Sequence, residues 1–505
     1  EMELCCLLTS LPPPPQHGAP RPSSPDKLGP GGEEDRITAL PDDMLLLVLA
    51  RLGCASAAAR TGILSRRWRG LWTRLTKATF RDVELGALES ALASLGPDPE
   101  VCLLDICAAG EEEDDVAPHR VSSVLRAAAR LLPVELVFKV RQDMHVLDGG
   151  EHPQLPHFQS ATTIELDTLY MALPPTAAGG FPALERLFIS RCYGLDLATL
   201  ILRSPHLRVL RAGCFGNVPS LKIHSASLEE LVLDKFVVRQ QDDGAAYRID
   251  IIAPALKQLM VSFTTRTLHY SVSISAPMLQ KLSWHCWYSP KDFMVGAFWF
   301  VMRLWLEIRP PSSQLGALAN TCLSMEIYVH RDQSMDAHGH FAQEEIEKLP
   351  VGNFNVVVLY LNLMDETHIF GPMVLHLLVA TNKIRTATRK LKVVLERWPS
   401  KAKEACPPIC PCHEPSNTRR TKTISLTSLE EVEIQGFQGL DDDFDFLKLI
   451  FQCAPILKRM TVKLLDNVAP SKDGWSEIGN TFKKYPSVEC YATSVSVDAT
   501  RSAEN

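Results

Sequence analysis

The chain has 505 residues, of which 46% are hydrophobic and 22% are charged, so most of it can bury a core. This length predicts about three domains or one long repeat array. The formal net charge of -7 argues against a protein that coats nucleic acid, because such proteins usually carry a strongly basic domain. The longest uncharged apolar stretch, residues 293–302, is about half as long as a membrane span. We therefore expect neither a nucleic-acid partner nor a membrane partner.

The first 34 residues contain eight prolines and four glycines, with too few apolar residues to offset the entropy of ordering. We expect a disordered tail there. Its apolar part, residues 4–8, is too short for a signal peptide. The 14 cysteines are scattered and lack the density of a secreted disulfide scaffold. These features predict a protein of the cytoplasm and/or the nucleus.

Three short helices are predicted between residues 35 and 80. Pro41 suits a first helical turn, an alanine-rich helix follows at 55–60, and Ser65 is a plausible N-cap for the third helix. The predicted apolar stripes are Leu45, Val48, Leu49 and Leu52 in the first helix and Trp68, Leu71, Trp72 and Leu75 in the third. A unit of about 40 residues cannot form a large core alone, so we expect a partner to complete it.

A leucine pattern recurs from about residue 100 onward and is most regular between residues 184 and 284. Five units begin at Leu184, Leu207, Leu228, Leu256 and Leu279, at steps of 23, 21, 28 and 23 residues. Such steps are typical of leucine-rich repeats, in which each turn of a solenoid donates one strand to a curved parallel sheet. The predicted fold class is therefore α/β, with a short helical unit followed by an irregular repeat solenoid over residues 100–400.

Less regular elements extend the solenoid on both sides. Further strands are predicted at 101–106, 134–140, 163–166, 324–329, 355–361 and 391–395, with a helix at 116–132. A Pro/Cys-rich connector at 401–423 interrupts the pattern. The pattern resumes at 429–434, and a helix at 442–453 and a last strand at 457–464 follow it. We assign residues 424–490 to a C-terminal repeat region.

Two segments resemble known families. Leu40-Pro41-Asp42-Asp43 and the string Leu-Ser-Arg-Arg-Trp-Arg-Gly-Leu-Trp at 64–72 closely resemble the F-box, particularly the plant type. The stretch 429–462, with Gly436-Phe437-x-Gly439 and Cys453-Ala454-Pro455, looks like the FBD region that ends many plant F-box proteins with leucine-rich repeats. The resemblance implies a substrate-recognition subunit of an SCF-type E3 ubiquitin ligase. In such a subunit the F-box binds a Skp-type adaptor, and through it a cullin, while the repeats hold an unidentified target protein.

Eight residues match the F-box motif and are expected to contact the adaptor. They are Leu40, Pro41, Leu45, Leu49, Leu64, Trp68, Leu71 and Trp72. The alternative is that these side chains pack only against each other and the first repeats, since apolar residues at helical spacing are usually core. At the level of the whole chain, the alternative function is a non-catalytic repeat scaffold that acts outside a ubiquitin ligase.

Other clusters favour ordinary structural roles. Arg66, Arg67, Arg69, Arg74 and Lys77 are expected to form a solvated helix face. Asp441, Asp442, Asp443 and Asp445 are expected to cap a helix. Two other groups contain residue types that could hold a metal, but a connector and a polar loop explain them better. The two groups are Cys406, Cys410, Cys412 and His413, and His330, His338 and His340 with Asp332 and Asp336. No phosphate-loop, dinucleotide, serine-hydrolase or metalloprotease motif is present, so we expect no catalysis, cofactor or metal.

Aromatic residues concentrate just after the last regular repeat. Eight of the 36 Trp, Tyr and Phe residues lie within residues 284–305. Trp and Tyr are enriched at binding hot spots, so Trp287, Tyr288 and Trp299 are our candidates for contact with a target protein. The alternative is that these rings fill a repeat core where the leucine pattern lapses. Residues 237–248, a polar segment within the 28-residue step, are a second candidate for shaping the target site.

Overall fold

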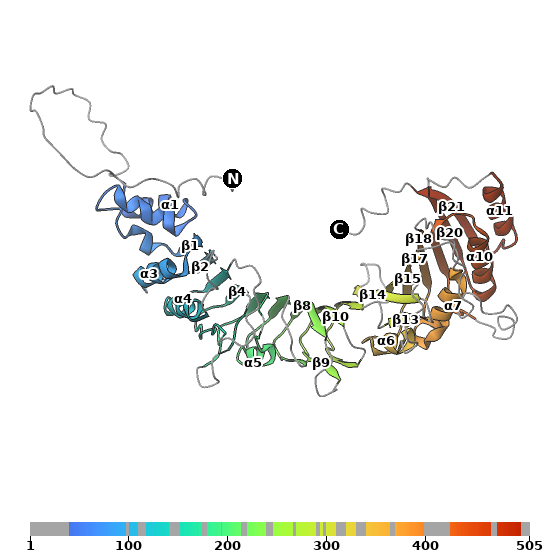
Figure 1. The fold of residues 1–505 in the computed structure, drawn as a ribbon, viewed down its shortest axis with the longest axis horizontal. Coiled ribbons are helices and arrows are strands. Elements are labelled where there is room, and N and C mark those ends of the chain that lie inside the picture. Colours follow the sequence, from blue (N-terminus) through green and yellow to red (C-terminus); the bar gives the residue numbers. More distant parts are fainter. Residues whose placement is uncertain are drawn as a thin grey trace, which may run out of the picture.

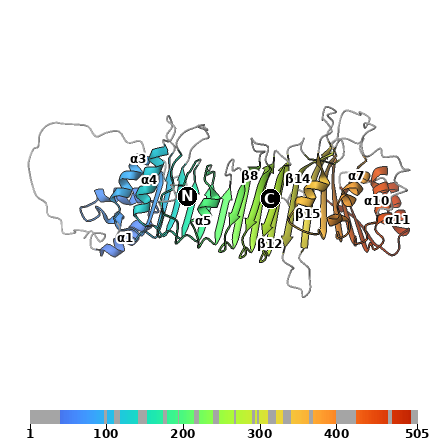
Figure 2. The ribbon, with the colours of Figure 1, turned by 90° about the horizontal axis from the view of Figure 1, so that it is seen from below.

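The computed structural model is a long arc of strands with helices on its outer side (Figure 1). The structure describes residues 40–96, 100–109, 118–140, 152–168, 170–173, 179–192, 194–213, 220–238, 246–265, 269–288, 293–295, 299–309, 320–329, 340–363, 369–397, 425–465 and 472–495. Figure 2 shows the strands side by side along the long axis. The predicted α/β solenoid with a curved, mostly parallel sheet is therefore confirmed.

The N-terminal unit begins with two of the predicted helices, α1 (Asp42–Ala50) and α2 (Ala55–Arg60). The prediction of one continuous third helix is wrong. The segment forms the 3-10 helix η2 (Thr61–Ile63), a run of turns and the 3-10 helix η3 (Leu71–Arg74). Gly70 has φ 80°, which ends any right-handed helix at that point, and the Ser65 hydroxyl has no hydrogen-bond partner, so it caps nothing.

The first half of the main sheet is a run of parallel strands that starts earlier than the sequence predicted. Its strands are β1 (Lys77–Val83), β2 (Leu103–Ala108), β3 (Glu135–Val140), β4 (Thr163–Asp167), β5 (Arg186–Ser190), β6 (Val209–Gly213), β8 (Glu230–Val238), β10 (Gln258–Thr265) and β12 (Lys281–Tyr288). Because β1 pairs with β2, the solenoid begins at residue 77, inside the segment assigned to the helical unit.

The register of these strands reproduces the spacing of the leucines. Leu187 pairs with Leu210, Leu210 with Leu231, Leu231 with Leu259, and Leu259 with Leu282. All five side chains are buried. The sequence steps of 23, 21, 28 and 23 residues are therefore the turns of the solenoid, with each leucine stacked on the one before it.

The second half of the sheet contains one reversed strand. Its strands are β14 (Trp299–Arg309), β15 (Asn320–Val329), β17 (Val356–Leu363), β18 (Lys390–Arg397), β19 (Glu431–Phe437), β20 (Arg459–Leu465) and β21 (Glu489–Val495), with β13 (Phe293–Val295) and β16 (His340–Phe341) attached beside β14. Among the described pairings of this sheet, only the three made by β14 are antiparallel. This reversal explains why the leucine spacing lapses after residue 284. The strand at 457–464 was predicted to be the last, but it is β20, and β21 follows it.

Helices and a small second sheet cover the outer face of the main sheet (Figure 1). The helices are α3 (Leu85–Ser94), α4 (Pro118–Arg130), α5 (Leu197–Leu202), α6 (Ala342–Lys348), α7 (Phe370–Ala380), α8 (Asn382–Arg385), α10 (Asp441–Cys453) and α11 (Lys472–Lys483). The small parallel sheet consists of β7 (Leu221–His224), β9 (Tyr247–Ile252) and β11 (Tyr270–Ser275). One continuous core lies between these layers, so the inner face of the arc carries the side chains that the core does not use.

Candidate functional sites

The N-terminal unit has a small core of its own. Leu45, Leu49, Trp68 and Leu71 are at most 5% exposed and pack together with Ala58 and Leu75. These four residues were expected to contact an adaptor, but their side chains are already covered by one another. The structure therefore corrects that expectation: they hold the unit together. Of the other four candidates, Leu40 and Trp72 are half-buried against this core, whereas Pro41 and Leu64 are exposed.

Two arginines of this unit, Arg67 and Arg74, fix the start of α1. The Arg67 guanidinium donates to Asp42 Oδ1 from Nε at 2.9 Å and from Nη2 at 2.7 Å, and Arg74 Nη1 lies 3.5 Å from Asp42 Oδ2. Arg67 also donates to the carbonyl oxygen of Leu40. These contacts join the end of the unit to its beginning, so at least two cations of the predicted basic face serve the fold.

The face of α1 turned away from this core is also apolar. Met44, Leu47 and Val48 are 48%, 61% and 45% exposed. A surface helix usually presents polar residues to water, and exposed apolar faces mark interaction sites. We use the name apolar patch for the exposed apolar residues of this unit, which are Met44, Leu47 and Val48 on α1, Leu52 after it, Ile63 on η2 and Leu64 after η2.

A second surface with binding character lies on the inner face of the arc, over β12 to β17. Register places Trp287, Arg303, Glu326 and Tyr360 in one row across β12, β14, β15 and β17. In the next row, Trp305 lies beside His285 on one side and Ser324 on the other. We define the aromatic patch as these side chains together with Tyr328.

Ring contacts tie the aromatic patch together. The rings of Trp305 and Tyr360 are 5.4 Å apart between centroids, and those of His285 and Trp287 are 6.2 Å apart and nearly perpendicular. Trp287, Trp305 and Tyr360 are all half-buried, so each ring keeps one part open to solvent. The residue of β15 opposite Trp305 is the small, buried Ser324, and the ring of Trp305 reaches Tyr360 diagonally across β15.

The charges within the aromatic patch are paired. Arg303 forms an ion pair with Glu326 and stands 5.5 Å over the ring of Trp305. The Tyr328 hydroxyl donates to Glu326 at 2.7 Å, and burial together with this hydrogen bond raises the pKa of Tyr328 to about 12. Burial also lowers the pKa of His285 below its usual 6.5, despite nearby carboxylates. The patch therefore carries no net charge near pH 7.

Two of the three predicted target-binding residues belong to the core. Trp299 is 0% exposed. Tyr288 is 4% exposed, and its hydroxyl donates at 3.2 Å to Glu345, a buried carboxylate on α6 that also accepts from Tyr270 and Lys348. Strand alternation turns Tyr288 inward and Trp287 outward, so only Trp287 remains available to a partner. The structure thus corrects the assignment of Tyr288 and Trp299.

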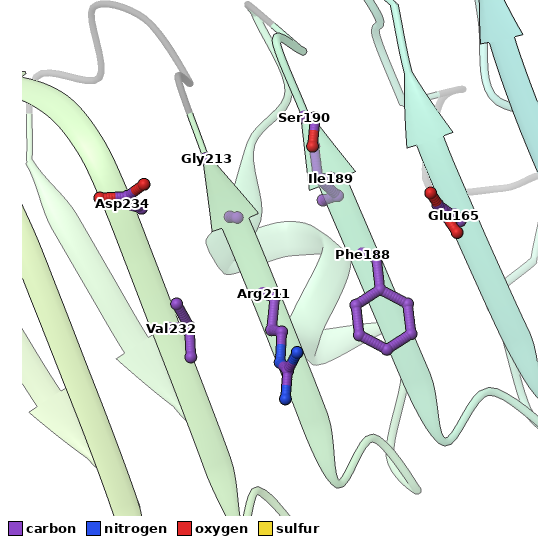
Figure 3. Close-up of a pocket in the computed structure, with 9 residues that line it drawn as sticks. Glu165, Phe188, Ile189, Ser190, Arg211, Gly213, Val232 and Asp234 are labelled. Atoms are coloured by element: carbon purple, nitrogen blue, oxygen red, sulfur yellow. The ribbon is translucent and has the colours of Figure 1, made fainter. Parts of the chain in front are cut away.

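A shallow hollow of about 360 Å³ opens on the inner face over β4 to β8 (Figure 3). It lies where Gly213 leaves a gap between Ser190 and Asp234. Arg211 projects into it, paired with Glu230 at 2.7 Å and 5.7 Å above the ring of Phe188. This hollow extends the accessible inner face toward the N-terminal repeats.

The Gly-Phe-x-Gly motif forms a buried corner between β19 and α10. Asp443 is fully buried, pairs with Arg397 at 2.5 Å and accepts hydrogen bonds from the backbone N–H groups of Gln438, Gly439 and Leu440. Gly436 has φ 78°, and a Cβ there would lie 2.1 Å from the carbonyl oxygen of Leu395. The expected role of the aspartates at the helix start is confirmed for Asp443, and the motif is structural.

Several predicted features lie outside the described residues. They are the cysteine/histidine group at 406–413, the polar residues at 330–338, residues 239–245 of the second candidate segment, and the N-terminal tail. In the parts of the chain that the structure describes, no three His, Cys, Asp or Glu residues gather closely enough to hold a metal ion. No described helix has the length and apolar character needed to cross a membrane.

Sequence reasoning missed Met44 and Leu47 on the exposed face of α1, and it missed the residues of other strands that join Trp287 in the aromatic patch. The run Met44-Leu45-Leu46-Leu47-Val48-Leu49 is apolar on every side of the helix, and this was the available signal for a second face. Arg303, Tyr328 and Tyr360 come from strands far apart in the sequence. Only strand pairing brings them to Trp287, so no local pattern could have grouped them.

Comparison with known proteins agrees with the motifs. The FBD family model matches residues 425–462, which span β19, α10 and part of β20. A putative F-box protein of Arabidopsis thaliana is 29% identical over 218 residues, which cover 40% of this chain and 45% of that protein. The meiotic F-box protein MOF of Oryza sativa subsp. japonica is 31% identical over 227 residues, covering 39% and 46%.

A shorter match is closer in sequence. An F-box/FBD/LRR-repeat protein of Arabidopsis thaliana is 53% identical over 47 residues, which cover 9% of this chain and 10% of that protein. The chain spans less than half the length of these relatives. The family model and these relatives show that segments of this chain are similar to plant F-box and F-box/FBD proteins.

Proposed function

We propose that this chain is the substrate-recognition subunit of an SCF-type ubiquitin ligase. In this proposal the apolar patch binds a Skp-type adaptor, the adaptor links the chain to a cullin, and the inner face of the arc holds a target protein. The chain itself performs no catalysis, and the ubiquitin chemistry belongs to other subunits.

The observation that carries the proposal is the second apolar face of α1. The unit's own core uses Leu45 and Leu49, yet Leu47 on this face remains 61% exposed, and Leu64, which follows η2, remains 67% exposed. Fully burying one such side chain contributes about 1.5–3 kcal/mol, so a partner that covered two of them would gain several kcal/mol. The relatives named as F-box proteins support an adaptor as that partner.

The test is capture of a purified Skp-type adaptor by the full chain. We expect Leu47→Asp with Leu64→Asp to weaken capture by roughly 100-fold or more, since about 1.4 kcal/mol is lost per decade of affinity. Both side chains point to solvent, so thermal unfolding should hardly change. The matched control is Leu202→Asp, because Leu202 is 82% exposed on α5 and distant in sequence from the unit. Equal capture by the double variant and the control would refute the apolar patch as the adaptor site.

A further inference from the structure

The aromatic patch has the chemistry of a site for an uncharged, rigid segment. Its one cation and one carboxylate, Arg303 and Glu326, pair with each other, and Trp287, Trp305 and Tyr360 offer half-open rings. A phosphate, an acidic peptide or a basic tail would find no unpaired opposite charge within the patch. Rings set close together on a neutral surface favour flat apolar side chains that lose little entropy on binding.

Proline-rich segments fit this description. A polyproline II helix is preformed and presents its rings to aromatic-lined grooves at a low entropic cost. This chain carries such a segment. Residues 11–25 contain seven prolines, four of them consecutive at Pro12–Pro15, and Arg21 is their sole charged residue.

The segment is long enough to reach the aromatic patch of its own chain. The described structure begins at Leu40, next to α1, and nine strand pairings lead from β1 to β14 along the sheet. At about 4.8 Å per step this distance is roughly 43 Å. Residues 16–39 can span roughly 75 Å at about 3.1 Å per residue, so they bridge it with length to spare.

We propose that residues 11–25 dock as a polyproline II helix on the aromatic patch of the same chain. The bound segment covers Trp287, Trp305 and Tyr360. If the patch also contacts the target protein, a consequence that rests on the proposed function, the target must displace this segment before it binds. The docking itself requires neither the adaptor nor a target, so it can be tested separately.

The probe is a fluorescent synthetic peptide with the sequence of residues 9–26, titrated into full-length chains and followed by anisotropy. In one chain Pro12→Ser, Pro13→Ser, Pro14→Ser and Pro15→Ser remove the tethered competitor. A short tether gives an effective concentration of about millimolar, so we expect the probe to bind the serine variant at least about tenfold more tightly than the wild-type chain. Equal affinity for both chains, or no binding to the serine variant, would overturn the proposal.

Location is tested in the serine variant. Trp305→Ala should weaken probe binding at least about tenfold, whereas Trp475→Ala, which changes a tryptophan that is 41% exposed on α11, should leave it unchanged. Trp287→Ala is the second patch variant, and thermal unfolding checks that each chain is folded. Unchanged affinity in both patch variants would place the segment elsewhere.

Two further measurements complete the test. Sedimentation should find the wild-type chain monomeric, because docking within one chain leaves no site for a second copy. A dimer that disappears in the serine variant would show docking between chains and overturn the proposal. Adaptor capture should be the same in the wild-type and serine chains, so failure of this inference is distinguishable from failure of the proposed function.

Discussion

The inner face of the arc differs between β12–β17 and β18–β21, although both regions belong to one sheet. Over β18–β21, opposite charges alternate across neighbouring strands. Glu431 lies 3.7 Å from Lys390 and 3.1 Å from Arg459, and Arg459 lies 3.7 Å from Glu489. Over β12–β17 the next two rows of the same face carry the rings of Trp305, Trp287 and Tyr360. We call the first region the charge ladder.

The difference shows that one sheet can carry paired side chains that support the fold in one region and side chains open to a partner in another. In the charge ladder, each of these side chains already has a partner on the next strand, which supports strand pairing. In the aromatic patch, half-open rings keep apolar area that a partner can still bury. The reversed strand β14 lies in the aromatic patch, where the repeat pattern of the sequence lapses.

The largest expected effect concerns the corner between β19 and α10, which the Gly-Phe-x-Gly motif forms. Gly436→Ala places a Cβ 2.1 Å from the Leu395 carbonyl oxygen at φ 78°, so β18 and β19 must separate. We expect a loss of at least about 4 kcal/mol in the free energy of unfolding of this region, measured by urea denaturation. Gly479→Ala is the control, because a Cβ at this helical position meets nothing within 4 Å and should be neutral or slightly stabilising. Similar losses in both variants would contradict the described corner.

A second prediction separates core rings from patch rings. Trp299→Ala should cost about 3–5 kcal/mol because Trp299 is fully buried, and Leu259→Ala, which removes a repeat leucine, should cost about 2–5 kcal/mol. Trp287→Ala should cost clearly less, because its ring is half-exposed. The measurement is chemical unfolding of the three variants. If Trp287→Ala is as destabilising as Trp299→Ala, Trp287 belongs to the core and the aromatic patch loses its outermost ring.

The smallest effect is the pH dependence of the charge ladder. Burial tends to raise the pKa of Glu433, but Lys463 at 2.9 Å and Lys392 outweigh it, so the pKa lies below its usual 4.5. The contribution of Glu433 is therefore fully present above about pH 4.5 and is lost as the pH falls through the folded-state pKa. Glu433→Gln should cost up to about 1 kcal/mol near pH 7 and progressively less as the pH falls through the folded-state pKa of Glu433. A cost that does not change with pH would show that the charge of Glu433 contributes nothing.

The sequence predicted the regular part of the fold well for a physical reason. Each buried leucine from Leu187 to Leu282 stacks on the equivalent leucine of the next turn, so the pattern is local and repeats. The reversed strand β14 was not predictable in this way, because strand direction depends on pairing with β12 and β15. The domain boundaries otherwise remain predictions, although the solenoid begins at β1.

The candidate sites were less predictable than the fold. The F-box motif identified the right unit, but it selected Leu45, Leu49, Trp68 and Leu71, which the unit needs for its own core. A motif marks residues that a fold requires, whether they face inward or outward. The concentration of aromatic residues likewise found the right strands, and only strand alternation could separate Trp287 from Tyr288.

The most direct test of the central claim is isothermal titration of the full chain with a purified plant Skp-type adaptor. The account predicts one adaptor per chain, with an affinity that falls by roughly 100-fold or more in the Leu47→Asp, Leu64→Asp variant and stays unchanged in Leu202→Asp. A folded wild-type chain that releases or absorbs no heat and forms no complex in a parallel size-exclusion run would contradict the account.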